Sequence, residues 1–341
     1  MTKPLFECKI EFSPSPHLSQ IYDGFAKLSK KGIINLNTVR TRQNETKPVI
    51  KVIVNNKYTV MYDTLDGLNW INGSLEENLQ YFKTNYDADY YFKRSYSKIL
   101  EGKAKNTKIY PLGLNYSFDY EGNYPLPIKE KLKKFIRQNI KKNVFKPSAF
   151  EYPPYKNNTD KVLFLCRLWN PDEVETDGLK SQREKINNDR IEFVQTCKNE
   201  FGDRFTGGIQ NDAFSRRMAK DLLMPHEITK KQNFIDAIKD HNICVTTTGL
   251  HDSTGWKLAE YVAASRAIIS EPLHYELPGD FKNPTHYLSF NNSSQLINNI
   301  NDLLKNPEMM REMMKENHRY YNNFVDSEKM ILNTLLKIDN D

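Results

Sequence analysis

Hydrophobic and polar positions in the second half of the chain follow two alternating patterns. Residues 161–169 form a nearly continuous apolar run that is typical of a buried strand, and residues 243–245 and 267–270 form shorter runs of this kind. Between them, residues 230–239 and 257–264 have apolar side chains at helical spacing. Strands that alternate with helices in this order predict a doubly wound, mostly parallel α/β sheet.

The same signals continue to the end of the sequence. They predict further strands at 204–209 and 287–290 and further helices at 188–202, 293–304, 307–324 and 326–338. The methionines between residues 308 and 314 recur at helical spacing, which is typical of core packing and not of a cofactor lining.

The first half predicts an α/β domain with an antiparallel component. Residues 6–12 alternate like a strand, and apolar positions in 17–31 have a helical period that ends at Gly32. Strands are expected at 33–36, 49–54 and 58–62. Asn55 and Asn56 separate the last two strands and predict a hairpin turn.

Length and local composition divide the chain into domains. At 341 residues it exceeds the usual size of a single core. Between residues 119 and 154 the composition shifts to Pro, Tyr and Lys. We therefore predict a first domain at 1–125, a linker at 126–157, a second domain at 158–325 and a terminal helix at 326–341.

A basic amphipathic helix is predicted inside the linker, at residues 128–142. Leu132, Phe135 and Ile136 share one stripe and lysines surround it. Contact with a membrane surface stays open for such a helix. Its narrow apolar face and the absence of Trp favour a solvated linker helix.

Composition excludes several classes of protein. No apolar run approaches the ~20 residues of a membrane span, and the first residues lack the apolar core of a secretory signal. We expect a cytoplasmic protein, with peripheral contact at the inner face of the membrane left open, and four reduced, structural cysteines. The net charge of +6 suits an anionic diphosphate, an anionic polymer or the cytoplasmic membrane face, without the basic stripe of a nucleic-acid binder.

The most informative stretch is the loop and helix between the strands at 243–245 and 267–270. The loop contains Gly249, and Ser253 or Thr254 is placed to cap the following helix. In an open α/β sheet, ligands bind at such loops, at the carboxyl ends of strands. Asp252 and Glu260 are separated by seven residues, with Gly255 three positions after the aspartate. A capped helix with an acid on its exposed face would also explain these residues.

The spacing of Asp252, Gly255 and Glu260 resembles the nucleotide-sugar signature of GT-B glycosyltransferases, in which two glutamates are spaced in this way. The resemblance implies two Rossmann-like α/β domains that face each other across a cleft, with terminal helices bridging back to the first domain. It further implies that Glu260 binds ribose hydroxyls and Asp252 approaches the donor sugar. Residues 253–255 (Ser253, Thr254 and Gly255) would bind the diphosphate at the helix N-terminus. Asp252 replaces a glutamate, and its shorter side chain leaves the sugar contact open.

Three cations are candidates for the donor phosphates. Arg167 ends the first strand of the second domain, where GT-B proteins have a cation that pairs with the diphosphate. Arg190, at the start of a predicted helix, is a second candidate, with a surface ion pair as the alternative. Lys257 follows the signature loop and, with Arg167, would neutralise charge on the leaving nucleoside diphosphate.

Other candidates are less specific. His251 precedes the first signature acid and is either a donor to phosphate or sugar, or a turn residue. Asp63 and Asp66 follow a strand, where one of them could orient or deprotonate an acceptor hydroxyl. An Asx turn closed by Gly67 is the alternative. Arg94 is a further candidate for contact with the donor phosphates, with an ordinary surface cation as the alternative.

The sequence thus predicts a hexosyltransferase-like glycosyltransferase. It would transfer a sugar from a nucleoside diphosphate donor, with a UDP-sugar favoured, to a hydroxyl of a glycan, wall polymer or glycoconjugate in carbohydrate biosynthesis. The resemblance favours retention of anomeric configuration and implies no bound metal or other cofactor. A nucleotide-dependent phospho-alcohol transferase and a non-catalytic glycan- or nucleotide-binding protein remain alternatives. The oligomeric state stays open. The phosphate-binding motif GxxxxGK[ST] and the dinucleotide fingerprint GxGxxG are absent from the sequence.

Overall fold

The computed structural model describes residues 4–40, 48–104, 106–140, 144–155 and 159–341. The chain forms two compact units. Unit 1 comprises Met1–Ala149, Tyr275–Gly279 and Asn322–Asp341, and unit 2 comprises Phe150–His274 and Asp280–Tyr321. The basic segment that the sequence assigns to a linker therefore belongs to unit 1. Its predicted end at Lys142, and the predicted boundary at residues 157 and 158, lie outside the described residues.

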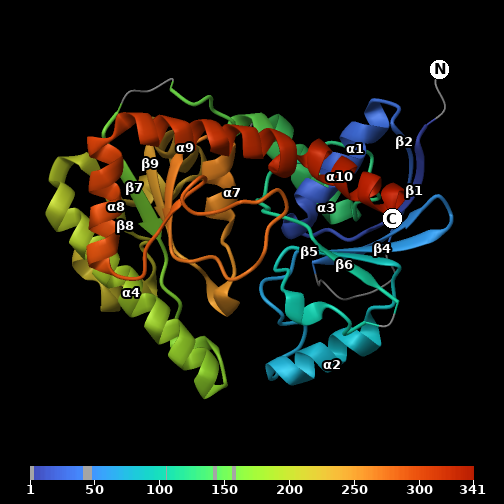
Figure 1. Ribbon diagram of the computed structural model, residues 1–341, viewed down its shortest axis with the longest axis horizontal. Coiled ribbons are helices and arrows are strands. Elements are labelled where there is room, and N and C mark those ends of the chain that lie inside the picture. Colours follow the sequence, from blue (N-terminus) through green and yellow to red (C-terminus); the bar gives the residue numbers. More distant parts are fainter. Residues whose placement is uncertain (1–3, 41–47, 105, 141–143, 156–158) are drawn as a thin grey trace. The chain divides into compact units, whose positions relative to one another are not determined.

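Unit 1 is built on a mixed sheet (Figure 1). Its helices and strands are β1 (Phe6–Phe12), α1 (Ser19–Lys30), β2 (Ile34–Arg40), β3 (Val49–Val54), β4 (Tyr58–Asp63), α2 (Leu75–Asn85), β5 (Tyr90–Lys93), β6 (Lys108–Pro111), α3 (Ile128–Phe135) and α10 (Ser327–Asn340). In the described residues the strand order is β2-β1-β3-β4-β5-β6. β3 is antiparallel to both β1 and β4, and the other neighbours are parallel.

The turn between β3 and β4 confirms the predicted hairpin. Asn55 and Asn56 have φ angles of 54° and 52°, in the left-handed region that asparagine tolerates better than most residues. β3 pairs with β4 from Val54 opposite Tyr58 to Val49 opposite Asp63. The antiparallel component that the sequence predicts is therefore present.

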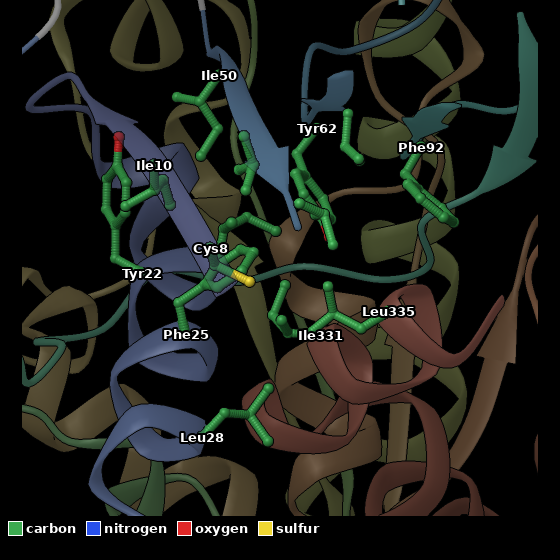
Figure 2. Close-up of a cluster of buried hydrophobic side chains, with 14 of the residues drawn as sticks. Cys8, Ile10, Tyr22, Phe25, Leu28, Ile50, Tyr62, Phe92, Ile331 and Leu335 are labelled. Carbon is green, nitrogen blue, oxygen red and sulfur yellow. The ribbon is translucent and has the colours of Figure 1, made fainter. Parts of the chain in front are cut away.

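Hydrophobic side chains cover both faces of the unit 1 sheet. On one face, Ile10 and Tyr62 pack against Phe25 of α1 and Ile331 and Leu335 of α10 (Figure 2). The opposite face carries a second cluster that includes Trp70, Phe82 and Tyr91. Because side chains alternate along a strand, β5 sends Tyr91 to this second cluster and Phe92 to the first.

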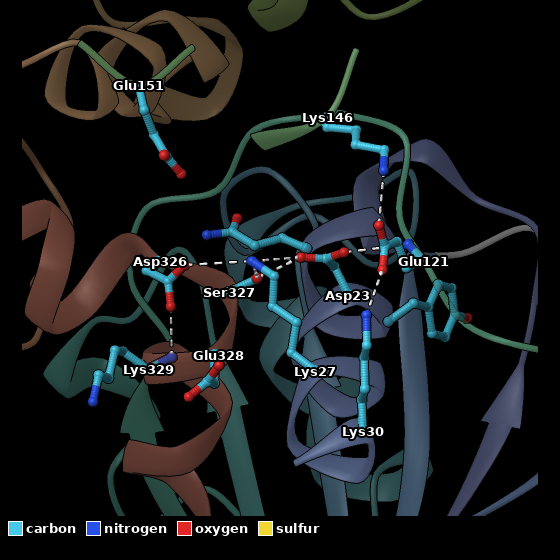
Figure 3. A network of polar contacts seen from close by, with 12 residues as sticks. Asp23, Lys27, Lys30, Glu121, Lys146, Glu151, Asp326, Ser327, Glu328 and Lys329 are labelled. Carbon is cyan, nitrogen blue, oxygen red and sulfur yellow. Dashed lines mark hydrogen bonds and ion pairs between the residues drawn. The ribbon is translucent and has the colours of Figure 1, made fainter. Parts of the chain in front are cut away.

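α10 joins unit 1 although it lies at the end of the chain. A Cβ atom on Gly24 would lie 2.2 Å from the carbonyl oxygen of Ser327, so glycine lets α1 and α10 approach closely. Beside this contact, Ser327 Oγ donates to Asp23 at 2.6 Å, and Lys27 Nζ lies 3.0 Å from Asp23 and 3.5 Å from Asp326 (Figure 3). Polar pairs therefore fix the start of α10 while its apolar face enters the core.

Unit 2 is a doubly wound parallel sheet. Its elements are β7 (Val162–Cys166), α4 (Asp177–Phe201), β8 (Phe205–Ile209), α5 (Ala213–Met218), α6 (Lys231–Asp240), β9 (Ile243–Thr246), α7 (Trp256–Ala263), β10 (Ala267–Ser270), β11 (Leu288–Ser289), α8 (Ser293–Lys305) and α9 (Pro307–Tyr320). In the described residues the order is β11-β10-β9-β7-β8, with every neighbouring pair parallel. The direction of winding reverses between β7 and β9, and this reversal is the topological switch point.

The unit 2 core explains why its strands read as continuous apolar runs. Val162 and Phe164 pack with Phe193 and Val194 of α4, and Met313 of α9 belongs to the same cluster. The intervening strand residues are buried as well, because α7 contacts β9 and β10. The predicted α/β class, with Rossmann-like sheets, is confirmed, and so is the packing role of the methionines.

α4 is longer than predicted. The sequence places its start near residue 188, whereas the helix begins at Asp177 after Thr176, whose Oγ1 accepts a hydrogen bond from Leu179 N. Its first turns are polar because Arg183 and Asn187 bind loop atoms and not a hydrophobic core. Periodicity of apolar residues therefore misses this half of the helix.

Candidate functional site

A buried arginine ties the two loops at the switch point of unit 2. Arg190, on α4, is 7% exposed. Its Nη1 donates to the Arg167 carbonyl oxygen at 2.6 Å, at the end of β7. After β9, its Nε donates to Thr247 Oγ1 at 3.0 Å and its Nη2 to the Thr248 carbonyl oxygen at 3.0 Å. The alternative of a surface ion pair for Arg190 is wrong, because the guanidinium is enclosed and bonded to both loops.

Glu271, an acid that the sequence analysis did not predict, binds a loop residue at the same edge of the sheet. Glu271 directly follows β10, and its Oε2 accepts hydrogen bonds from Thr248 N at 2.7 Å and Thr248 Oγ1 at 3.0 Å. Thr248 is thereby fixed between Arg190 and Glu271. A carboxylate immediately after a buried strand was the available sequence signal.

The loop before α7 turns through two residues with left-handed backbone. His251 and Asp252 have φ angles of 58° and 56°. Gly249 N donates to the Ser253 carbonyl oxygen at 2.8 Å and closes the turn. His251 N donates to Gln182 Oε1 of α4 at 3.2 Å, and the Asp252 side chain is exposed. The backbone of both residues therefore serves the turn, which leaves the exposed Asp252 carboxylate available to a ligand.

The predicted cap of α7 is wrong. Gly255 is the N-cap residue, and it makes no side-chain cap. Ser253 Oγ instead donates to the Leu250 carbonyl oxygen at 2.8 Å, inside the loop. A glycine N-cap has no side-chain oxygen of its own to offer the first amide groups of α7. An anion is suited to that position, because the helix dipole favours negative charge there.

Glu260 is buried, not exposed as its helix position suggested. It is 3% exposed, and its Oε1 lies 2.8 Å from Nζ of Lys231, the first residue of α6. The hydrogen bond that the structure gives to this carboxylate uses Oε1. Lys231 thus orients the carboxylate. The sequence did not point to Lys231, because it lies 29 positions before Glu260.

Positive charge accumulates around Lys257, one turn before Glu260. Burial lowers the pKa of the Lys257 ammonium below its usual range, and the nearby Arg190 and Arg167 guanidinium groups lower it further. Cys166 and Glu260 act in the opposite direction. Because the group is disfavoured as a cation, an anion bound beside it would relieve an existing electrostatic cost.

Trp169 forms a fixed platform next to Arg167. The guanidinium carbon of Arg167 lies 3.5 Å from the centre of the indole ring. Asn187 of α4 holds the Trp169 backbone, accepting from its N at 2.8 Å and donating to its O at 2.7 Å. The buried indole Nε1 has no hydrogen-bond acceptor among the described residues. Neither Trp169 nor Asn187 was predicted, although an aromatic residue three positions after a buried strand was a usable signal.

Asp63, the predicted acceptor-side residue, is enclosed in unit 1. Its carboxylate is 0% exposed and accepts hydrogen bonds from Leu65 N, Trp70 Nε1, Tyr91 Oη and Lys93 Nζ. A sugar hydroxyl cannot reach a carboxylate that is fully covered, so this geometry favours a structural role. The neighbouring Asp66 is half exposed and pairs with the buried Arg94.

The structure therefore brings together, within unit 2, the predicted residues Arg167, Arg190, Ser253, Thr254, Gly255, Lys257 and Glu260, with His251 and Asp252 in the same loop. Asp63 belongs to unit 1. Within the described residues, no group of three or more His, Cys, Asp and Glu side chains is placed to hold a metal ion. No helix in the described part of the chain has the length and apolar character needed to cross a bilayer.

The chain was compared with known proteins. No family model and no curated protein matches it. Among solved structures, Anabaena HepE in complex with UDP-glucose is similar at 12% identity and a TM-score of 0.46, over 97% of this chain and 100% of that one. The pneumococcal O-GlcNAc transferase GtfA in complex with UDP and GlcNAc has 12% identity and a TM-score of 0.42, over 92% and 55%. S. aureus TarM has 16% identity and a TM-score of 0.38, over 88% and 72%. These structures are GT-B glycosyltransferases, the family that the sequence resembles.

Proposed function

We propose that this protein is a glycosyltransferase that binds a nucleoside diphosphate sugar at the switch point of unit 2. The donor is a UDP-sugar, and the acceptor is a hydroxyl of a glycan, wall polymer or glycoconjugate. One observation carries the proposal: Arg167, Arg190 and Lys257 converge at the carboxyl ends of β7 and β9, beside the N-terminus of α7, whose N-cap is Gly255. This is the place and the charge that a diphosphate requires in a doubly wound sheet.

Each part of the donor then has a partner. The amide groups at Gly255 and the first turn of α7 receive the diphosphate, and Lys257 neutralises the charge that develops on it as the sugar departs. Arg190 positions the two loops and has two of its five N–H groups left after its three hydrogen bonds to protein atoms. Arg167, on its Trp169 platform, is a second phosphate contact.

Glu260 is the proposed ribose ligand. Lys231 holds Oε1, which directs Oε2 toward the ribose hydroxyls as a hydrogen-bond acceptor. Asp252, exposed in the preceding loop, is assigned to the sugar, and His251 in the same loop is a second candidate for a sugar or phosphate contact. Asp63 has no catalytic role in this proposal, because its carboxylate is covered.

Replacement of Glu260 by alanine tests the donor site. UDP binding, measured by calorimetry, is expected to weaken about 10- to 100-fold, because a hydrogen bond to a charged group contributes about 1.5–3 kcal/mol. Glu260→Gln keeps the side-chain volume and is expected to weaken binding less. Glu308→Ala, at an exposed position on α9, is the matched control and should bind UDP like the unchanged protein. Equal UDP affinity of Glu260→Ala and the unchanged protein would remove Glu260 from the site. Preference for a glycerol nucleotide over every UDP-sugar would contradict the proposed donor.

The anomeric outcome is a separate expectation. Retention follows from the resemblance of the Asp252-Gly255-Glu260 spacing to a signature that is commonest among retaining enzymes. Proton NMR of the product formed in the first minutes is expected to show the anomeric configuration of the donor. A product with the opposite configuration would show inversion and leave the donor site itself untouched.

A further inference from the structure

The helix α3 of unit 1 and the residues just after it contact the rest of the unit through cationic side chains. Arg137, just beyond its end, pairs with Asp119, and Lys134 Nζ lies 5.6 Å from the centre of the Tyr120 ring. No residue of α3 is buried. These two contacts to unit 1 are made by cationic side chains, whereas an amphipathic helix on a globular core usually turns its apolar side inward.

The apolar side of α3 is exposed to solvent. Ile128, Leu132 and Phe135 are 85%, 59% and 57% exposed. At about 100° per residue their positions fall within an arc of about 60°, so they form one stripe. The sequence favoured a solvated linker helix because the stripe of Leu132, Phe135 and Ile136 is narrow; Ile136 is half-buried in the structure, and Ile128 extends the exposed line instead. Three large apolar side chains are thus exposed along a single line, and contiguous exposed apolar side chains mark interaction sites more often than scattered ones do.

Lysines flank the stripe. Lys129 and Lys131 follow Ile128 on either side of the apolar line, and both are exposed. Lys133 is exposed as well and pairs with Glu130 at 2.7 Å. Long cationic side chains beside an apolar stripe allow the stripe to enter the acyl boundary while the ammonium groups stay at the level of the headgroups.

We propose that α3 is a membrane-surface helix that docks unit 1 on a bilayer rich in anionic lipids. The apolar stripe inserts at the headgroup boundary, and the lysines attract the negative surface. Charge complementarity selects this occupant, because the rim of the stripe is cationic on both sides. The inference goes beyond the proposed transferase function and does not depend on it.

Vesicle sedimentation with the full-length chain tests the proposal. At low salt the protein is expected to sediment with phosphatidylcholine vesicles that contain about 30% phosphatidylglycerol, and to stay in solution with pure phosphatidylcholine. Binding should fall steeply as salt is raised. The variant Ile128→Ser, Leu132→Ser, Phe135→Ser is expected to bind at least tenfold more weakly. Because all three positions are exposed, its thermal unfolding temperature should be unchanged.

Two further variants separate the contributions. Lys129→Glu combined with Lys131→Glu is expected to abolish the preference for anionic vesicles. Leu75→Ser combined with Met218→Ser removes two apolar side chains that are 51% and 49% exposed elsewhere, and it should bind like the unchanged protein.

Three outcomes would overturn the proposal. They are an unchanged protein that does not sediment with anionic vesicles, equal binding by the stripe variant, and equal binding to both vesicle types. A dimer in sedimentation velocity that the stripe variant loses would assign the stripe to a second copy of the chain instead.

Discussion

Replacing Lys257 by methionine is expected to lower kcat/KM for sugar transfer from a UDP-sugar about 100- to 1,000-fold. The lysine is the proposed donor to the leaving diphosphate, and the arginines around it make the site cationic before the donor arrives. Methionine keeps the length and removes the charge. Lys305→Met, at an exposed position on α8, is the control and should leave kcat/KM unchanged.

The free energy of unfolding of Lys257→Met tests whether misfolding causes this loss of activity. Burial lowers the pKa of Lys257, so its charged form is less favourable in the native state than in the unfolded chain, and the residue contributes no stability. The free energy of unfolding of Lys257→Met should therefore be equal to or higher than that of the unchanged protein. A variant with near-normal transfer activity would contradict the role of Lys257.

The same residue predicts a dependence of donor binding on pH. Bound phosphates raise the pKa of Lys257 from its lowered value in the free protein, so binding takes up protons at pH values between the two pKa values. UDP affinity should then decrease as pH rises through the interval between the two pKa values of Lys257. Calorimetry in two buffers of different ionisation enthalpy measures the number of protons taken up when UDP binds. The variant Lys257→Met should show no such proton uptake.

Replacing Asp63 by alanine is expected to lower the free energy of unfolding by about 3–5 kcal/mol. Asp63 and Lys93 form an ion pair at 3.2 Å in which both side chains are 0% exposed. Burial already lowers the pKa of Lys93. In Asp63→Ala the Lys93 ammonium would lose its carboxylate partner. It would still donate to the Leu65 carbonyl oxygen, 2.7 Å away, but this acceptor is neutral and does not balance the buried charge. Urea denaturation measures the effect.

Two variants define the cause of that loss. Asp87→Ala, at an exposed position of unit 1, should change the stability by less than about 0.5 kcal/mol. Lys93→Met combined with Asp63→Asn removes both charges and should cost less than Asp63→Ala alone. A cost below about 1 kcal/mol for Asp63→Ala would show that the buried pair contributes little.

The unit around α7 was predictable because its signals are local. A strand at residues 243–245, a glycine-containing loop and a helix ending near Ala264 each follow from a few neighbouring residues, and the structure has β9, the loop and α7 at these places. Arg167 and Lys257 were found for the same reason, since Arg167 directly follows a strand and Lys257 lies at the start of a helix, whereas Arg190 was proposed from a helix start that the structure places at Asp177.

Partners that are distant in sequence were not predictable. Glu260 is buried beside Lys231, which belongs to α6 and comes within 2.8 Å of it only in the folded unit. Asp63 lies in a loop after a strand, as predicted. It is covered because β5 pairs beside β4 and brings Tyr91 and Lys93 to it. A local pattern shows where a charged residue falls, but only sheet pairing determines what surrounds it.

The place of α10 in unit 1 imposes an order on biosynthesis. Ile331, Leu335 and Ile338 belong to the same core as β1 and α1, which leave the ribosome first. Roughly 230 residues separate β6, the last strand of that sheet, from Ile338, and their translation takes on the order of 10–45 s at about 5–20 residues per second. During that interval the nascent sheet of unit 1 exposes apolar side chains that α10 covers in the finished fold. A chaperone that binds such surfaces would therefore be expected to engage it before synthesis is complete.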